Sequence, residues 1–143
     1  MIDGGLRTCF RIHLPHFHWQ SIESGLTGGG IPDSNACYKG QEFWIEFKKT
    51  DRVKIASLHP DQVGWHLRRY RAGGRTFFAV RFRHAGGPRK GAPIDRLLIY
   101  RGRDAKDLLL HGLNVSAALS SGDKGPSSWD WKAVEALLLG KFG

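Results

Sequence analysis

The chain has 143 residues, and 22 Lys and Arg against 13 Asp and Glu give it a net charge of +9 at pH 7. This length indicates a single domain over residues 1–143, and 41% hydrophobic and 11% aromatic residues argue against disorder. No apolar run approaches the roughly 20 residues that cross a bilayer, and Met1–Phe10 lacks the order of a secretory signal. We therefore expect a cytoplasmic protein with no membrane partner.

Strands and turns are expected in the first third of the chain. Phe43, Ile45 and Phe47 alternate with Trp44, Glu46 and Lys48, which predicts a strand with one core-facing side and one side carrying an acid and an amine about 7 Å apart. Around this strand, the sequence predicts a helix at Leu6–Leu14 ended by Pro15, a strand at His16–Ile22, a glycine-rich loop at Ser24–Pro32, a strand at Ser34–Tyr38, and a turn at Lys39 and Gly40 before Glu42–Lys48.

A helix follows at Pro60–Arg71, with Ser57 or His59 as its cap and Gly73–Gly74 at its end. Its apolar stripe is expected at Val63, Leu67 and Tyr70, with Gln62, His66 and Arg69 on another face. The remaining expected elements are strands at Thr76–Phe82 and Arg96–Tyr100, a basic loop at His84–Pro93, and helices at Asp104–His111 and Trp129–Phe142. The order predicts an α/β fold with a mixed central β-sheet flanked by helices.

The charge excess is concentrated in one segment. From Lys48 to Lys90 there are twelve Lys and Arg against Asp51 and Asp61, which gives 12 − 2 = +10. A basic segment of this size favours a polyanionic partner, of which nucleic acid is the commonest, although a merely soluble basic surface is the alternative.

Cysteine and histidine give weaker signals. Cys9 and Cys37 fit no paired metal-ligand spacing, so we expect free thiols. His13, His16 and His18 lack a second ligand pair, which favours polar or phosphate-facing residues over a zinc site.

Several motifs in the order found here resemble the PD-(D/E)xK nuclease superfamily. The matching pieces are Gly30-Ile31-Pro32-Asp33, Trp44-Ile45-Glu46-Phe47-Lys48 and Gln62 on the following helix. Ile22–Gly25, Gly28–Asp33, Gln62–Trp65 and Ala72–Gly74 extend the resemblance to virus-type replication-repair nuclease domains, relatives of Holliday junction resolvases, over about residues 20–83. Phe47 stands where these relatives often carry Leu or Val.

The resemblance implies a restriction-endonuclease-like core at about residues 20–101, with a C-terminal helical extension at about 104–143. It implies that Asp33 and Glu46 hold Mg²⁺ or Mn²⁺ with the Phe47 carbonyl, because such ions bind one or two carboxylates and further oxygens. Lys48 would position the attacking water and balance charge. Glu23 matches an upstream acid that would hold a second metal or orient water, and Gln62 would approach the bound water or a phosphate.

The function expected from the resemblance is that of a metal-dependent, structure-specific DNA endonuclease, most like a phage Holliday junction resolvase in bacterial or phage-infected cytoplasm. A nicking or flap endonuclease, or an exonuclease, is the enzymatic alternative, and a non-catalytic nucleic-acid-binding module is the alternative of another class. A homodimer on branched DNA is expected because a four-way junction needs two cuts, with apolar surface near Phe17 and Trp19 and on the C-terminal helix. The candidate DNA contacts are Lys49, Arg68, Arg69, Arg71, Arg81, Arg83, Arg89 and Lys90.

Overall fold

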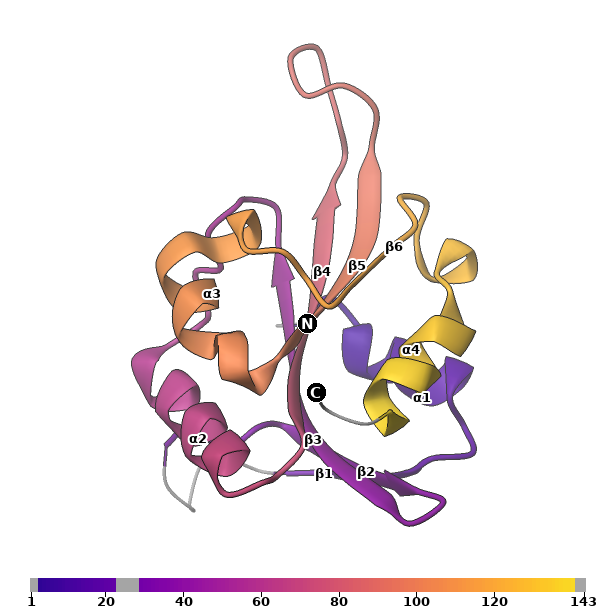
Figure 1. Ribbon diagram of the computed structural model, residues 1–143. Helices are drawn as coiled ribbons and strands as arrows, with labels where there is room; N and C mark the ends of the chain where they lie inside the picture. Colours follow the sequence, from indigo (N-terminus) through magenta and orange to yellow (C-terminus); the bar gives the residue numbers. More distant parts are fainter. Residues whose placement is uncertain (1–2, 23–28, 141–143) are drawn as a thin grey trace.

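A six-stranded mixed sheet forms the centre of the protein, and helices cover both of its faces (Figure 1). The computed structural model describes residues 3–22 and 29–140. The strands lie side by side in chain order: β1 (His18–Ser21), β2 (Ser34–Tyr38), β3 (Gln41–Thr50), β4 (Thr76–His84), β5 (Ile94–Arg101) and β6 (Leu119–Ser121). Neighbouring strands are antiparallel except β3 and β4, which are parallel. The predicted mixed sheet flanked by helices is therefore confirmed.

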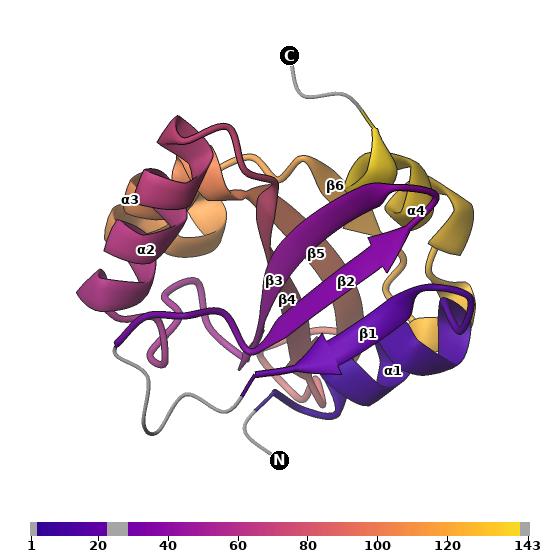
Figure 2. The same ribbon diagram turned by 90° about the horizontal axis from the view of Figure 1, so that it is seen from below.

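The helices form two layers on opposite faces of the sheet (Figures 1 and 2). The helices are α1 (Leu6–His13), α2 (Pro60–Arg71), α3 (Ala105–His111) and α4 (Trp131–Leu139). Helices α2 and α3 cover one face, and α1 and α4 cover the other. Each layer has its own apolar core, one built around Phe10, Phe43 and Phe47 and the other around Phe78 and Tyr100.

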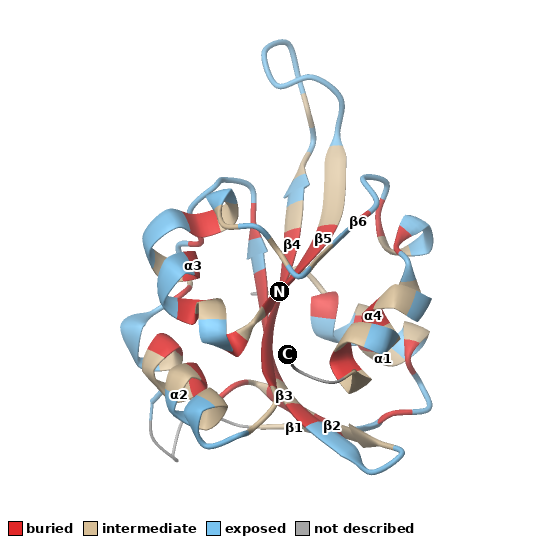
Figure 3. Cartoon of the chain, viewed as in Figure 1, coloured by how far each residue is buried: buried red, intermediate tan, exposed pale blue. Residues whose placement is uncertain are grey.

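Strand β3 has the two different sides that its alternation predicts. Phe43, Ile45 and Phe47 are buried in the core beneath α1 and α4. Glu46 and Lys48 lie on the other side, facing α2, and both are only 5% exposed. Because the central strands are covered on both faces (Figure 3), these two charged side chains lie in the interior of the fold.

The segment before β3 and the helix that follows this strand obey the predicted turn and helix-end chemistry. Lys39 (φ 51°) and Gly40 (φ 77°) both take positive φ angles, as a two-residue hairpin turn of the favoured type requires, and they join β2 to β3. Helix α2 begins at Pro60 after the cap residue His59 and ends before Gly73, whose φ of 91° ends the helix. The parallel β3–α2–β4 connection then places α2 over the β3 face that carries Glu46 and Lys48.

The face assigned to His66 is a point where the sequence prediction was wrong. His66 is fully buried beneath α2, where its ring stacks on Phe78 at 3.8 Å between centroids and its Nδ1 lies 2.5 Å from Thr76 Oγ1. Tyr70, expected on the buried stripe, is only half-buried. A histidine with one hydrogen-bonding partner can be buried as an aromatic ring. A hydropathy pattern counts histidine as polar and therefore placed it on the wrong face of the helix.

The C-terminal segment is part of the central fold. Strand β6, which was not predicted, pairs with β5, and α4 starts at Trp131, two residues later than expected. Val134 and Leu138 are fully buried in the α1–α4 core, together with Trp129. Three residues are too few for a strand to show alternation, which explains why β6 was missed.

Candidate active site

Asp33 and Glu46 come together because of the register between β2 and β3. Ser34 lies opposite Ile45, so the next step of the antiparallel register places Asp33 opposite Glu46. Asp33 is fixed there by two backbone contacts: its Oδ2 accepts a hydrogen bond from Phe47 N at 3.2 Å, and its carbonyl accepts one from Ile22 N at 2.8 Å. The two carboxyl groups thus converge from adjacent strands.

The environment of this pair disfavours two bare negative charges. Burial, and next the nearby charge of Asp33, raises the pKa of Glu46 to about 8. Burial also raises the pKa of Asp33, against the opposing effect of the hydrogen bond from the Phe47 backbone. Asp33 Oδ1 is buried and has no hydrogen-bond partner among the described residues. Two converging carboxyls with an open oxygen suit either a shared proton or a cation.

Lys48 lies beside the carboxyl pair and is held in place by the loop before α2. Its Nζ donates to the Ser57 carbonyl at 2.6 Å. Burial lowers the pKa of Lys48, while the charges of Glu46, Asp33 and Asp61 oppose that change. The Lys48 ammonium is therefore held in place and largely shielded from water, and the nearby carboxylates favour its charged form.

The N-terminus of α2 closes one side of the site. A cleft of about 300 Å³ is lined by Gly29, Gly30, Ile31, Asp33, Glu46, His59, Asp61 and Gln62. Gly30 has φ 87°, and a Cβ there would lie 2.2 Å from the Asp61 carbonyl oxygen, so this approach of loop and helix requires glycine. Of the predicted glycine-rich loop, Gly29 and Gly30 thus pack closely against α2, and residues 24–28 lie outside the described residues.

The other predicted site residues are placed as follows. Gln62 lines the cleft, but its Oε1 also accepts the His59 backbone N–H at 3.0 Å, so it caps α2. The Phe47 side chain points into the opposite core, and only its backbone borders Asp33. Glu23 lies outside the described residues. Within residues 3–22 and 29–140, no group of three or more His, Cys, Asp or Glu could hold a metal.

Two residues of the site were not assigned to it from the sequence. Asp61, next to Gln62 in the first turn of α2, lines the cleft. Burial, with a smaller effect from the nearby charge of Lys48, lowers the pKa of His66 to about 3. The sequence could have indicated both residues, because Asp61 and His66 lie within about one helical turn of Gln62, which was already assigned to the site.

The basic segment does not form a single surface. Arg68 and Arg71 are exposed on α2, whereas Arg83, Arg89 and Lys90 are exposed on the long β4–β5 hairpin. This hairpin projects beyond the rest of the molecule, well away from α2 (Figure 1). Lys49, also exposed, alternates with Lys48 and so belongs to the opposite face of β3.

Arg81 is buried, unlike the other predicted DNA contacts. It is bound to both Asp95 oxygens at 2.8 and 2.6 Å and donates to the Gly4 carbonyl at 2.9 Å. Its guanidinium also lies 5.5 Å from the centre of the Trp129 ring. Because all three guanidinium nitrogens of Arg81 make contacts within the fold, this side chain is not placed to bind a phosphate.

The N-terminal histidines and the cysteines have structural surroundings. His13 stacks on Trp131 at 4.4 Å, and His16 Nε2 lies 2.5 Å from Glu135 Oε1, so both link the N-terminal segment to α4. Cys9 and Cys37 are free thiols, as predicted.

Comparisons with known proteins do not identify a family for this chain, so its function is argued from the site. Neither protein-family models nor the sequences of curated proteins match this chain. In the part of the chain that the structure describes, every helix is too short or too polar to span a membrane.

Proposed function

We propose that the protein is a metal-dependent DNA endonuclease whose active site is the cleft lined by Asp33 and Glu46, with Lys48 beside these two carboxyls. The observation that carries the proposal is the convergence of the buried Glu46 carboxyl and the half-buried Asp33 carboxyl, whose buried Oδ1 has no partner, beside a fixed ammonium. A structural ion pair needs one acid and one base, whereas this interior site holds two acids against one base. The sequence resemblance to PD-(D/E)xK nucleases supports the same three residues.

The donor set fits Mg²⁺ or Mn²⁺. Asp33 Oδ1 and the Glu46 carboxylate supply the hard oxygen ligands that such ions prefer, and Asp61 lies on the same cleft. The Phe47 carbonyl is the proposed additional ligand, because the Phe47 backbone is already tied to Asp33. A bound dication supplies activation of water and neutralisation of charge at the phosphate.

Lys48 would act through its charge and its fixed position. Its tie to the Ser57 carbonyl holds the ammonium beside the carboxyls without blocking them. Held there, it orients an attacking water and offsets the negative charge that develops at phosphorus. Gln62, already fixed as a cap, would contribute its remaining amide donor to a phosphate or water.

A mixed sheet flanked by helices is compatible with the restriction-endonuclease-like core that the resemblance implies. We propose branched DNA as the substrate, with a four-way junction as the first candidate and nicks or flaps as the alternative. A non-catalytic binding module would not need two converging carboxyls facing a polyanion.

The test is incubation with labelled linear, nicked, flap and four-way DNA in Mg²⁺, in Mn²⁺ and in excess chelator. We expect cleavage that requires the metal and is abolished in Asp33→Asn, which keeps the shape of the side chain. Asp107→Asn, the same change on the exposed surface of α3, is the matched control and should cleave normally. Cleavage in chelator, or by Asp33→Asn, would overturn the assignment.

A further inference from the structure

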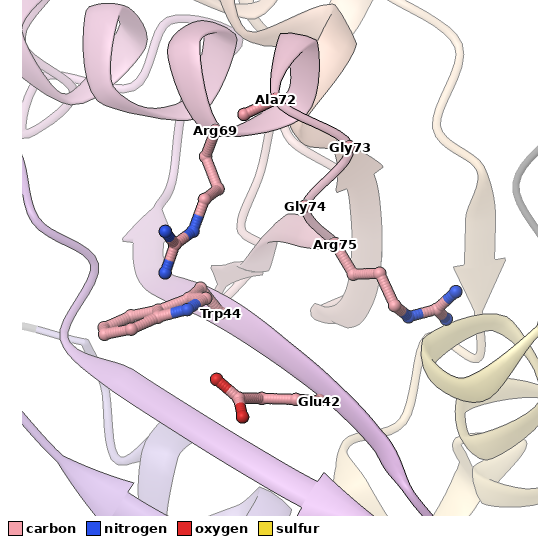
Figure 4. Close-up of a pocket in the computed structure, with 7 residues that line it drawn as sticks. All are labelled: Glu42, Trp44, Arg69, Ala72, Gly73, Gly74 and Arg75. Atoms are coloured by element: carbon pink, nitrogen blue, oxygen red, sulfur yellow. The ribbon is translucent and has the colours of Figure 1, made fainter.

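A second hollow lies on the same face of β3 as the candidate active site. It encloses about 340 Å³ and is lined by Glu42, Trp44, Arg69, Ala72, Gly73, Gly74 and Arg75 (Figure 4). Trp44 and Glu46 are two residues apart on one side of the strand, so the hollow begins roughly 7 Å from the carboxyl pair. Its volume lies within the range of small-ligand sites.

Trp44 and Arg69 give the hollow an aromatic and cationic wall, and Trp65, which is not part of the lining, packs against both of them. The Arg69 guanidinium lies 5.1 Å from the ring centres of both Trp44 and Trp65, and the two indoles are 5.3 Å apart. A Cβ on Gly74 would lie 2.7 Å from Arg69 Cγ, so glycine at this position leaves room for the arginine stem. The wall therefore offers planar groups that stack on nucleobases.

The two tryptophans here differ from the other three in the chain. Trp19, Trp129 and Trp131 each donate the indole N–H to a backbone carbonyl within the fold. Trp44 and Trp65, both described and half-buried, make no such hydrogen bond. Their partial exposure and unpartnered N–H groups are features of a contact surface more than of core packing.

The charges around the hollow favour a neutral ligand over a phosphate. Arg75 points away from it and donates to the Gly140 and Leu138 carbonyls at the end of α4 (Figure 4). Of the two charged groups that remain, Arg69 is stacked on the indoles, and Glu42 is held by the Asn35 amide at 3.0 Å. The Glu42 carboxylate repels a phosphate but accepts a hydrogen bond from an amino group.

We propose that this hollow binds one unpaired nucleobase that carries an exocyclic amino group, next to the cleavage site. This inference rests on the proposed function, because it assumes that DNA reaches the neighbouring carboxyl pair. The base stacks against Trp44 and Arg69, and its amino group donates to Glu42. The substrate class is accordingly DNA with an unpaired nucleotide at the branch, and adenine, cytosine or guanine is preferred over thymine there.

The test measures binding in chelator, so that its outcome does not depend on cleavage. The probes are a labelled duplex and the same duplex with a short flap of dC, of dT or of abasic nucleotides. We expect the dC flap to bind roughly tenfold or more tightly than the duplex or the abasic flap, since stacking of one base is worth a factor of this order. Trp44→Ala should remove this advantage, and Trp44→Phe should keep much of it.

Three further variants separate base binding in the hollow from general attraction between opposite charges. Arg69→Ala should lose the flap advantage, whereas Arg71→Ala removes the same charge from the same helix outside the hollow and should weaken all probes alike. Glu42→Ala should abolish the preference for dC over dT. A flap containing 2-aminopurine should show quenched fluorescence on binding, and Trp44→Ala should restore the fluorescence.

Equal binding of abasic and dC flaps would overturn the inference and identify a phosphate site. Equal binding of dC and dT flaps would overturn the role of Glu42. Either result leaves the nuclease proposal standing, whereas failure to bind any DNA probe would remove the proposed function itself.

Discussion

At the residue scale, the proposed role of Lys48 depends on its buried ammonium, which lies beside the Asp33 and Glu46 carboxyls. Replacing it by methionine keeps the stem and removes the ammonium, so we expect kcat to fall by about 100-fold or more while DNA affinity is nearly unchanged. Lys49→Met, the neighbouring exposed residue on the other face, should affect affinity and leave kcat as it is. Single-turnover cleavage and binding of both variants measure the split. A Lys48 variant with normal kcat would remove this residue from the mechanism.

His66 should make stability depend on pH. Because burial holds the pKa of the folded His66 at about 3, against 6.5 in the unfolded chain, only the unfolded chain takes up this proton between those values. The free energy of unfolding should therefore decrease as pH falls below 6.5, by at most about 1.4 kcal/mol per pH unit from this group.

Glu46 acts with the opposite sign, since a pKa raised to about 8 makes the folded chain bind its proton first as pH falls. The measurement is therefore urea unfolding of wild type and His66→Gln from pH 7.5 to 4.5, compared as a difference. We expect the wild type to lose stability relative to the variant toward low pH. Parallel curves would mean that His66 is not buried in its neutral form.

At the scale of elements, Arg81 joins the β4–β5 pair to the N-terminal segment. Arg81→Met leaves the partly buried Asp95 carboxylate with only the longer contact to Arg83 at 3.7 Å, so we expect about 3 kcal/mol or more of lost stability. The double variant Arg81→Met, Asp95→Leu removes both charges and should recover most of that loss. Urea unfolding of both decides this, and a single variant as stable as wild type would contradict the structural role.

The β4–β5 hairpin is an element whose basic residues are free to meet DNA. Arg89 and Lys90 are exposed at its tip, which is held by the Gly87–Gly91 backbone contact. Replacing both by alanine should reduce the slope of log affinity against log salt by about 1.8, because each phosphate contact accounts for about 0.9.

Stability should stay unchanged in that variant, since neither side chain is buried. Lys106→Ala with Lys132→Ala removes the same charge from exposed positions on α3 and α4 and is the control. If both double variants change the salt slope equally, the hairpin has no special part in binding.

At the scale of the whole molecule, the expected dimer surfaces are largely used inside one chain. Trp129, Val134, Leu138 and Phe17 are buried in the α1–α4 core, and Trp19 packs against it. Among the described residues, the exposed large apolar side chains are Ile12, Val53 and Leu110. Little apolar surface thus remains for a dimer that forms without DNA.

We therefore expect the free protein to sediment as one chain and two copies to assemble only on a four-way junction, where two cuts are needed. Sedimentation at micromolar protein, with and without a junction, measures this. A single copy on the junction, together with better cleavage of flaps, would remove the resolvase reading and keep the nuclease.

The sequence alone determined features that depend on neighbours along the chain. The alternation at Phe43–Lys48, the turn at Lys39–Gly40 and the bounds of α2 follow from side-chain period, positive φ and helix ends, which are local properties. The choice of Asp33, Glu46 and Lys48 came from motif order, and their convergence then required only one register between β2 and β3.

Only the tertiary structure decided which charged residues are free and which are used. Arg81 and Arg89 were both predicted to contact DNA, yet one is bound by Asp95 and the other is exposed on a projecting hairpin. Trp44 meets Arg69 only because the parallel β3–α2–β4 connection returns α2 over the strand. Such contacts depend on how segments far apart in the sequence pack together, and the pattern of neighbouring residues does not determine that packing.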